Sequence, residues 1–365
     1  MIKFEKISEQ EFLTDYWQKK PLLIKQALPG FISPISADEL SGLALEEEFE
    51  SRLVTGSTAN NKWGLKNGPF TEDSFSQLPK KDWTILVQGV DRFIDEFYEL
   101  IKQFDFIPRW RFDDVMTSYA ATGGSVGPHI DYYDVFLLQA SGTRRWSLST
   151  KDCTIDNHIK GIPLRIMQKF TSEQSFNVEP GDVLYIPPKT AHHGVSLDDE
   201  CVSISFGYRA YSAEEMHEYL NKNCPDEQLN SYYQDPCWIN ENSPALIPNS
   251  AIIKANEILA ISANEFAKFT TKLDILDSQI LQDIEFDIQN EIFDQSATYK
   301  LHNVCKIAYL SDNDTIKVFI NGELINLSNL DAQDVVNFCN KRIINSKNNK
   351  QLSKQLFDLN LIHTK

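Results

Sequence analysis

Two short segments far apart in this chain carry metal-binding side chains, and any fold that uses them must bring the segments together. The first is the triplet His129-Ile130-Asp131, and the second ends at His192, 61 residues after the aspartate. Residues i and i+2 of an extended strand point to one face, so His129 and Asp131 can share an ion. Two imidazoles and one carboxylate leave open the positions that non-haem iron(II) oxygenases use.

The sequence around both segments indicates short buried strands. Residues 123–128 form a glycine-rich loop that lets the backbone pack close to a site, and residues 135–138 (VFLL) are typical of a buried strand. Residues 180–182 (PGD) indicate a turn, and residues 183–186 (VLYI) indicate a strand that two prolines end. We therefore expect His192 on a loop that reaches back toward the first strand.

The choice of ligands has alternatives. A His-x-Asp triplet alone arises on many exposed strands, and only its combination with the second segment favours a metal site. His193 competes with His192, but the spacing from the prolines favours His192, with His193 turned outward or donating a hydrogen bond behind the ligands. The other histidines lack neighbouring carboxylates in the sequence and are interpreted as surface or structural residues: His158, His217, His302 and His363.

Five ordered blocks resemble the bacterial branch of the jumonji-C ribosomal oxygenases: residues 83–88 (WTILVQ), 110–116 (WRFDDVM), 127–136 (GPHIDYYDVF), 144–146 (RRW) and 180–188 (PGDVLYIPP). Members of this family have a cupin-like double-stranded β-helix and are hydroxylases that depend on iron(II) and 2-oxoglutarate. The resemblance implies the same fold and chemistry here. It also implies the substrate of the bacterial members, an arginine of the sixteenth large-subunit ribosomal protein, hydroxylated at its β-carbon (C3).

Residue by residue, the resemblance implies that His129, Asp131 and His192 bind the iron and leave positions for 2-oxoglutarate and dioxygen. Arg144 matches the basic residue that pairs with the distal carboxylate of 2-oxoglutarate. A planar guanidinium suits this role, because it can hold a carboxylate through two parallel hydrogen bonds. The neighbouring Arg145 should face the other way on a regular strand.

Serines complete the co-substrate site that the resemblance implies. Ser118 matches a position that adds a hydroxyl to the same carboxylate, and Ser205 lies on an expected strand, residues 201–206, that closes the far side. Both also fit the alternative of ordinary strand residues. Ser203 departs from the family, since the relatives carry asparagine at its position.

An arginine substrate requires carboxylates at the entrance to the site. Candidates close to the motifs in sequence are Asp113, Asp114 and Asp134, with Tyr133 or Tyr132 flanking the alkyl stem or stacking on the guanidinium, although acidic side chains are also common on ordinary surfaces. The formal net charge of −17 suits a basic partner such as a ribosomal protein and disfavours binding to nucleic acid.

At 365 residues the chain exceeds what one core usually takes, so several domains are expected. We predict an α+β protein with a jumonji-C catalytic domain at 1–208, its β-helix core at about 84–208. A helical dimerisation region at 209–275 and a winged-helix-like domain at 276–365 follow. The family's dimeric habit implies a homodimer.

Local signals place helices and one hairpin. Capping boxes at Ser8, Ser36 and Ser212 should begin helices. In the C-terminal part, apolar residues at Ile280, Ile284, Ile288 and Phe293 trace a helical face, helices are expected at 331–344 and 350–359, and Asn321-Gly322 should form a type I′ turn. No direct DNA binding is expected, because acidic residues dilute the lysines of this region: Asp331, Asp334 and Asp358.

Six widely spaced cysteines indicate neither a zinc site nor a disulfide framework, and a reducing compartment, the cytoplasm, is the simplest interpretation. No signal peptide or membrane span is expected. Three other functions stay open: a histidyl hydroxylase, a jumonji-C demethylase acting on an N-methyl group, and a cupin-like protein that binds metal without turnover. Arg144 argues against the last, since a bare metal site needs no counter-ion for a co-substrate.

Overall fold

The computed structural model describes residues 1–59, 62–239, 243–287, 292–312, 315–327 and 330–365. They form two compact units. The first unit comprises Met1–Phe104 and Asp113–Arg209, and the second comprises Asp105–Phe112 and Ala210–Lys365. Among the described residues, no helix is both long and apolar enough to cross a membrane.

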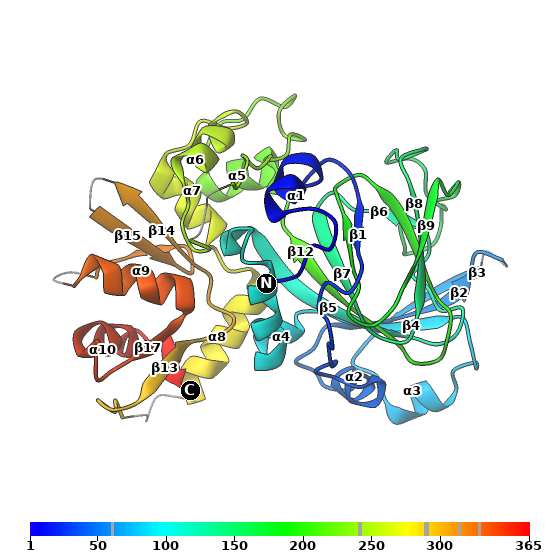
Figure 1. Ribbon diagram of the computed structural model, residues 1–365, viewed down its shortest axis with the longest axis horizontal. Helices are drawn as coiled ribbons and strands as arrows, with labels where there is room; N and C mark the ends of the chain where they lie inside the picture. The colour runs from blue at the N-terminus through cyan, green and yellow to red at the C-terminus, as the bar shows by residue number, and fades with distance from the viewer. Residues whose placement is uncertain (60–61, 240–242, 288–291, 313–314, 328–329) are drawn as a thin grey trace. The chain divides into compact units, whose positions relative to one another are not determined.

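The first unit contains two sheets (Figure 1). The larger has the strand order β1 (Leu22–Ile24), β10 (Val183–Ile186), β7 (Asp134–Ser141), β12 (Cys201–Tyr208), β5 (Phe112–Ala120), β4 (Trp83–Val87), β2 (Ser51–Ser57) and β3 (Lys62–Asn67). The smaller has the order β6 (His129–Ile130), β11 (Ala191–Ser196), β8 (Arg144–Ser149) and β9 (Gln174–Val178). From β6 to β12 the chain passes repeatedly from one sheet to the other, as a double-stranded β-helix does.

An apolar core joins the two sheets. Val135, Leu137, Leu184 and Ile186 of the larger sheet form one buried cluster with side chains of the smaller sheet, Trp146, Leu148 and Val178. Alternate residues of a strand point to the same face of its sheet, so both sheets contribute side chains to this cluster. The smaller sheet thereby packs against the larger one. Its strand β6 carries His129 and ends directly before Asp131, two residues of the predicted metal site.

Short helices cover the first unit: α1 (Glu9–Asp15), α2 (Ala37–Leu43), α3 (Glu72–Ser76) and α4 (Asp95–Ile101), with 3-10 turns η1 (Val90–Arg92) and η2 (Lys102–Phe104). Ser8 and Ser36 begin α1 and α2 with full capping boxes, as the sequence predicts. The ring of Phe12 on α1 packs edge-on against Tyr185 at 5.0 Å, and this contact attaches the helix to the larger sheet.

The second unit begins with helices and ends with two small sheets. After the 3-10 turn η3 (Arg109–Arg111), the helices are α5 (Ala213–Leu220), α6 (Asn249–Asn256), α7 (Ala263–Thr270) and α8 (Ile275–Asp287). One sheet has the order β17 (Ile343–Asn345), β13 (Thr298–Leu301) and β18 (Ile362–Thr364); the other has β14 (Ile307–Asp312), β15 (Thr315–Ile320) and β16 (Glu323–Ile325). Helices α9 (Ala332–Lys341) and α10 (Lys350–Asp358) share a core with both sheets.

The second unit differs from the sequence prediction at two helices, because Phe293, expected on one helical face with Ile280 and Ile284, lies beyond α8 and is not helical. The helix expected at 331–344 ends at Lys341, and residues 343–345 form strand β17 instead. Arg342 adopts a left-handed conformation (φ 58°) that stops the helix, and its Nη2 donates to the carbonyls of His302 and Cys305, both at 2.8 Å. The expected turn at Asn321-Gly322 is present, with φ of 53° and 83°. Of the expected helical face at 280–293, Ile288 lies outside the described residues.

Candidate metal centre

The two histidines of the predicted site lie on paired strands. His192 of β11 is directly opposite His129 of β6 in the antiparallel register, and their ring centroids are 4.2 Å apart. The expectation that His192 lies on a loop is wrong, because residues 191–196 pair with β8 on one side and Ala191 and His192 pair with β6 on the other. The strand fixes the position of His192 more firmly than a loop would.

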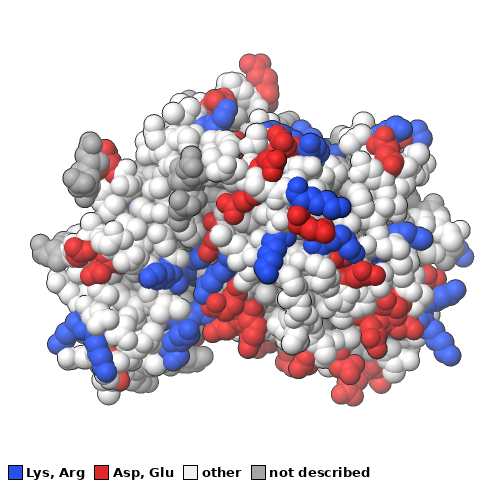
Figure 2. Space-filling model, viewed as in Figure 1, with Lys and Arg blue, Asp and Glu red and all other residues white. Residues whose placement is uncertain are grey.

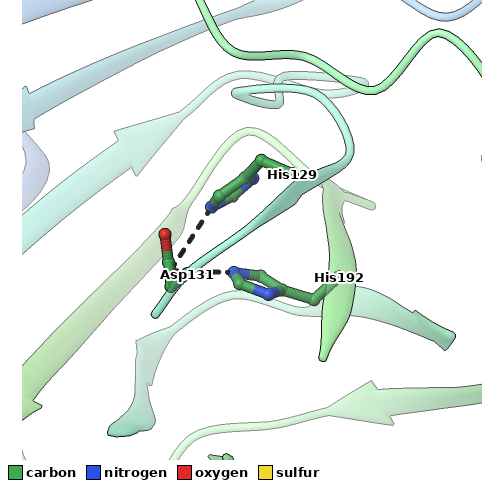
Figure 3. A group of neighbouring side chains, drawn as sticks. All are labelled: His129, Asp131 and His192. Atoms are coloured by element: carbon green, nitrogen blue, oxygen red, sulfur yellow. Dashed lines mark ion pairs between the residues drawn. The ribbon is translucent and has the colours of Figure 1, made fainter. Parts of the chain in front are cut away.

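Asp131 completes a compact group (Figure 3). Its Oδ2 lies 3.7 Å from Nε2 of His129 and 3.5 Å from Nε2 of His192. One ligand atom from each residue falls within 4.8 Å of the others, which is a spacing that could hold one metal ion. Two histidine nitrogens and one carboxylate form the facial triad typical of non-haem iron(II) sites.

Backbone carbonyls orient both rings. Nδ1 of His129 is 2.9 Å from the carbonyl oxygen of Gly127, and Nδ1 of His192 is 3.0 Å from that of Thr190. A carbonyl oxygen can only accept a hydrogen bond, so each Nδ1 carries a proton and the neutral form of each ring has its lone pair on Nε2. Both imidazoles therefore present a metal-binding nitrogen toward Asp131.

Burial keeps His192 neutral. Its side chain is 3% exposed, and burial, followed by the proximity of His129, lowers the pKa of His192 to about 4. The neutral form is the one that coordinates a metal. The pKa of His193 is also lowered to about 4, chiefly by burial; its ring packs edge-on against Phe170 at 6.0 Å. As the next residue on the strand, His193 faces away from the site, which agrees with the preference for His192.

Arg144 lies on the same small sheet as the two histidines. Its side chain is buried, Nε donates to Sγ of Cys201 at 3.3 Å, and the guanidinium carbon lies 5.7 Å from the ring of Trp146. Trp146 in turn lies 5.8 Å from the ring of His192.

Among the residues that the structure describes, the buried Nη2 of Arg144 has no hydrogen-bond partner. A buried, unpartnered N–H of a cation is costly unless an anion approaches it. Arg145 is exposed, as expected.

The serines near Arg144 have different surroundings. Ser118 is buried, and its hydroxyl donates to the carbonyl of Ser203 at a long 3.5 Å. The Ser203 hydroxyl donates to Oε1 of Gln139 at 2.8 Å. Ser205 is half-buried on β12, opposite Leu137 of β7. Sequence reasoning overlooked Gln139 and Cys201. For Gln139 a signal was available, since it is the one amide side chain in the otherwise apolar run of β7 and could have been expected to need a buried hydrogen-bond partner.

The acidic candidates divide into two groups. Asp134 is 1% exposed, and its carboxylate accepts hydrogen bonds from the hydroxyl of Tyr185 at 2.5 Å and from the amide of Gln18 at 3.0 Å. The expectation that Asp134 lines an entrance is therefore wrong, since this carboxylate is buried and accepts hydrogen bonds inside the first unit.

Asp113 and Asp114 are partly exposed. Burial, followed by the nearby charges of Asp113 and Asp91, raises the pKa of Asp114 to about 7, and the amide of Gln88 donates to Asp114. Burial of its hydroxyl and the nearby charge of Asp131 raise the pKa of Tyr133 well above the ordinary value, while 40% of this residue stays exposed. An excess of negative charge thus adjoins the metal-binding group.

Comparison with known proteins identifies the family. The JmjC domain family matches residues 99–216. The chain is 36% identical over 256 residues to the ribosomal protein uL16 3-hydroxylase of Escherichia coli K12, covering 70% of this chain and 67% of that protein. It is 33% identical over 354 residues to a probable ribosomal oxygenase of Haemophilus influenzae, covering 91% and 85%. The chain belongs to the JmjC-domain ribosomal oxygenases.

Solved structures of this family resemble the chain throughout. The ribosomal oxygenase YcfD of Escherichia coli matches all of both chains with a TM-score of 0.72 and 27% identity. YcfD in complex with cobalt and 2-oxoglutarate matches 98% of this chain with a TM-score of 0.67 and 28% identity. The predicted family, the cupin-like α+β fold and the class of enzyme, a 2-oxoglutarate-dependent dioxygenase, are confirmed. The domain boundaries stay a prediction.

Proposed function

We propose that this ribosomal oxygenase uses iron(II), 2-oxoglutarate and dioxygen to hydroxylate C3 of an arginine in the large-subunit ribosomal protein uL16. The observation that carries the proposal is the placement of His129, His192 and Arg144 on one four-stranded sheet, with Asp131 directly after its strand β6. His129 and His192 direct Nε2 toward Asp131, and Arg144 lies on the neighbouring strand with a buried Nη2. In support, the relative from Escherichia coli is named as a uL16 3-hydroxylase.

The donor set fits both groups. Two neutral imidazole nitrogens and one carboxylate oxygen suit iron(II), and Nη2 of Arg144 suits a carboxylate of the co-substrate. When bound, iron(II) with 2-oxoglutarate and dioxygen supplies the oxidant that converts a C–H bond to C–OH, with release of succinate and carbon dioxide. His129, Asp131 and His192 would hold the metal, and Arg144 would hold the distal carboxylate, with Ser118 and Ser205 as further hydroxyl donors.

The protein must place the target carbon and keep water away from it. The rings of Trp146 and His192 lie 5.8 Å apart and both residues are buried, so this side of the site is lined by packed side chains rather than by solvent-exposed groups. We propose that Asp113 and Asp114 hold the guanidinium of the substrate and that Tyr133 contacts its alkyl stem. The raised pKa of Asp114 supports this role, because a cation placed among these carboxylates would relieve their mutual repulsion.

The charge of the chain supports a basic protein substrate. Acidic side chains gather over α2 and α3 of the first unit (Figure 2), and the exposed ones there are Asp38, Glu39, Glu46, Glu47, Glu48, Glu50, Glu72 and Asp73. With a net charge of −17, such a surface attracts a cationic protein over distances near the Debye length. A substrate of this kind favours the cytoplasm as the location.

By analogy with the family, we propose a role for each of three regions of the chain. Residues 1–208 carry out catalysis, residues 209–275 form the contact between two copies in a homodimer, and residues 276–365 form a winged-helix-like module that contacts protein rather than DNA. Helices α5, α6 and α7 lie within the second of these ranges. Sedimentation at micromolar concentration tests the homodimer, which should have twice the mass of the 41.8 kDa chain.

Mass spectrometry tests the reaction. Purified uL16 is incubated with the protein, iron(II), ascorbate and 2-oxoglutarate, and a His129→Ala variant serves as the control. A gain of one oxygen on an arginine, absent from the control, supports the proposal. A gain on a histidine, or the loss of a methyl group from another protein, supports one of the alternative activities instead. Absence of succinate above the control contradicts the proposed reaction on uL16 and leaves a cupin-like protein that binds metal without turnover as an alternative.

A further inference from the structure

Cys201 is a buried residue whose sulfur contacts Arg144, the residue proposed to bind the co-substrate. It is the first residue of β12 and is 0% exposed. Its Sγ accepts two hydrogen bonds, from Nε of Arg144 at 3.3 Å and from Nε2 of Gln139 at 3.4 Å. A thiol in an apolar core needs neither donor, so the contact is a specific feature of this end of the sheet.

Both the nitrogen and the oxygen of the Gln139 amide are held by hydrogen bonds. Nε2 also donates to the carbonyl of Ser141 at 2.7 Å, and Oε1 accepts from the hydroxyl of Ser203 at 2.8 Å. A register shift between β12 and β7 at Val202 and Ser203 lets these side chains meet. Gln139 is 1% exposed, and the network therefore has little freedom to rearrange.

This network restricts how Arg144 can bind an anion. A guanidinium offers a carboxylate two bidentate edges, one formed by Nε with an Nη and one formed by the two Nη groups. The sulfur of Cys201 occupies Nε, and the ring of Trp146 lies 5.7 Å from the guanidinium carbon. Nη2 is buried and, within the described part of the chain, has no partner. The free edge is therefore the end formed by Nη1 and Nη2.

We propose that Cys201, supported by Gln139, is a positioning residue that turns Arg144 so that its two Nη groups hold the distal carboxylate of 2-oxoglutarate end-on. The inference rests on the proposed function, since it takes 2-oxoglutarate as the occupant of this site. It also gives Ser203 a role: its hydroxyl fixes the amide that supports Cys201.

The expected effect is selective for ligands with a distal carboxylate. Replacing Cys201 by valine keeps most of the volume but removes the acceptor, so Arg144 can rotate and one hydrogen bond to a charged group is lost. The affinity for 2-oxoglutarate should then fall about tenfold. Cys201→Ser keeps an acceptor at the same position, and its affinity should stay within about threefold of the wild type. A 2-oxo acid that lacks the distal carboxylate should bind all three proteins equally.

Calorimetry under anaerobic conditions provides the test, with full-length protein loaded with Mn(II) so that no turnover occurs. Affinities for Mn(II), 2-oxoglutarate and 2-oxovalerate, which has the same carbon chain without the distal carboxylate, are measured for the wild type, Cys201→Val and Cys201→Ser. The inference predicts that only the affinity of Cys201→Val for 2-oxoglutarate falls.

Two results overturn the inference in different ways. If the wild type does not bind 2-oxoglutarate, the proposed function fails and the inference fails with it. If the wild type binds 2-oxoglutarate and both variants bind it equally well, or both lose it equally, Cys201 does not act through its acceptor and only the inference fails. Unchanged Mn(II) affinity in both variants shows that the metal-binding residues keep their arrangement.

Discussion

His129 and His192 face each other across β6 and β11, and both turn Nε2 toward the same oxygen of Asp131. Neither ring can turn without losing its hydrogen bond to a backbone carbonyl. Strand pairing and these hydrogen bonds, rather than a metal, thus fix the ring orientations, so folding orders the ligands. Preorganisation of this kind strengthens binding, because little freedom is lost when the ion enters.

Removal of one ligand should weaken metal binding strongly. Even residues that only orient a ligand cost 10–100-fold in affinity, so His192→Ala should weaken Co(II) binding by more than about 100-fold and abolish turnover. Calorimetric titration with Co(II) measures the first effect and succinate formation the second. The matched control is His193→Ala on the same strand, which should keep Co(II) affinity; an equal loss in both variants would contradict the choice of His192.

Substitution of Arg144 should act on the co-substrate and spare the metal. Arg144→Gln removes the charge opposite the distal carboxylate, and hydrogen bonds to charged groups contribute about 1.5–3 kcal/mol, so KM for 2-oxoglutarate should rise roughly 10- to 100-fold. Steady-state succinate formation measures the change. The exposed neighbour provides the control, since Arg145→Gln should leave KM unchanged, and a rise in both variants would point to a general effect of charge.

The carboxyl of Asp114 should make substrate binding depend on pH. Its pKa of about 7 means that it ionises between pH 6 and 8. Because only the ionised form attracts a guanidinium, kcat/KM for uL16 should rise across this window in the wild type and stay nearly flat in Asp114→Asn. At pH 8 the variant should have a KM for uL16 about tenfold higher. Asp73→Asn on α3, which removes the same charge at an exposed position, should keep the pH dependence of the wild type.

The same carboxyl should lower stability at alkaline pH. The folded protein keeps the Asp114 proton up to about pH 7, whereas the unfolded chain loses it near pH 4, so the free energy of unfolding falls as pH rises through this window. At pH 8, Asp114→Asn should therefore be more stable than the wild type, by on the order of 2 kcal/mol after allowing for partial exposure. Urea unfolding at pH 5 and pH 8 measures the difference, which should be clearly smaller at pH 5, where the folded protein still holds the proton.

A buried histidine in the second unit should have the opposite effect on stability. Burial, followed by the charges of His363 and Arg342, lowers the pKa of His302 to about 4. Between pH 6.5 and 4 the unfolded chain binds a proton that the folded chain does not, so stability is full above pH 6.5 and is lost as pH falls. His302 should contribute about 2 kcal/mol to the loss between pH 7 and pH 5. In His302→Gln the decrease in urea stability over this range should be smaller by that amount.

Sequence reasoning selected the three side chains that the structure brings together as a possible metal site, because their signals are local and specific. The His-x-Asp triplet, the strand of residues 183–186 and the three capping serines each depend on neighbours along the chain, and all appear as expected. The errors arose where partners distant in sequence decide the outcome. His192 lies on a strand because β6 and β8 flank it, and Asp134 is buried because Tyr185 and Gln18 bind its carboxylate.

Of the two small sheets in the second unit, the one formed by β17, β13 and β18 was also beyond local signals, whereas the β15–β16 hairpin was predicted from its turn. Strand β18 has three residues and exists through pairing with β13, and β17 follows a helix whose end depends on the contacts of Arg342. Cys201 was interpreted only as a reduced thiol, since nothing in its sequence neighbourhood indicates Arg144, which lies 57 residues away.

Two carbonyl groups, those of Gly127 and Thr190, set the orientation of the histidine rings. A carbonyl belongs to every residue type, so its hydrogen-bonding ability survives any substitution that leaves the local backbone path intact. Gly127 constrains that path, since its φ of 81° is strained for other residues and a Cβ would lie 2.9 Å from Ile166. The orientation of the two rings is therefore encoded in the backbone path of these segments, so a substitution beside the histidines should disturb it only where it changes that path, as at Gly127.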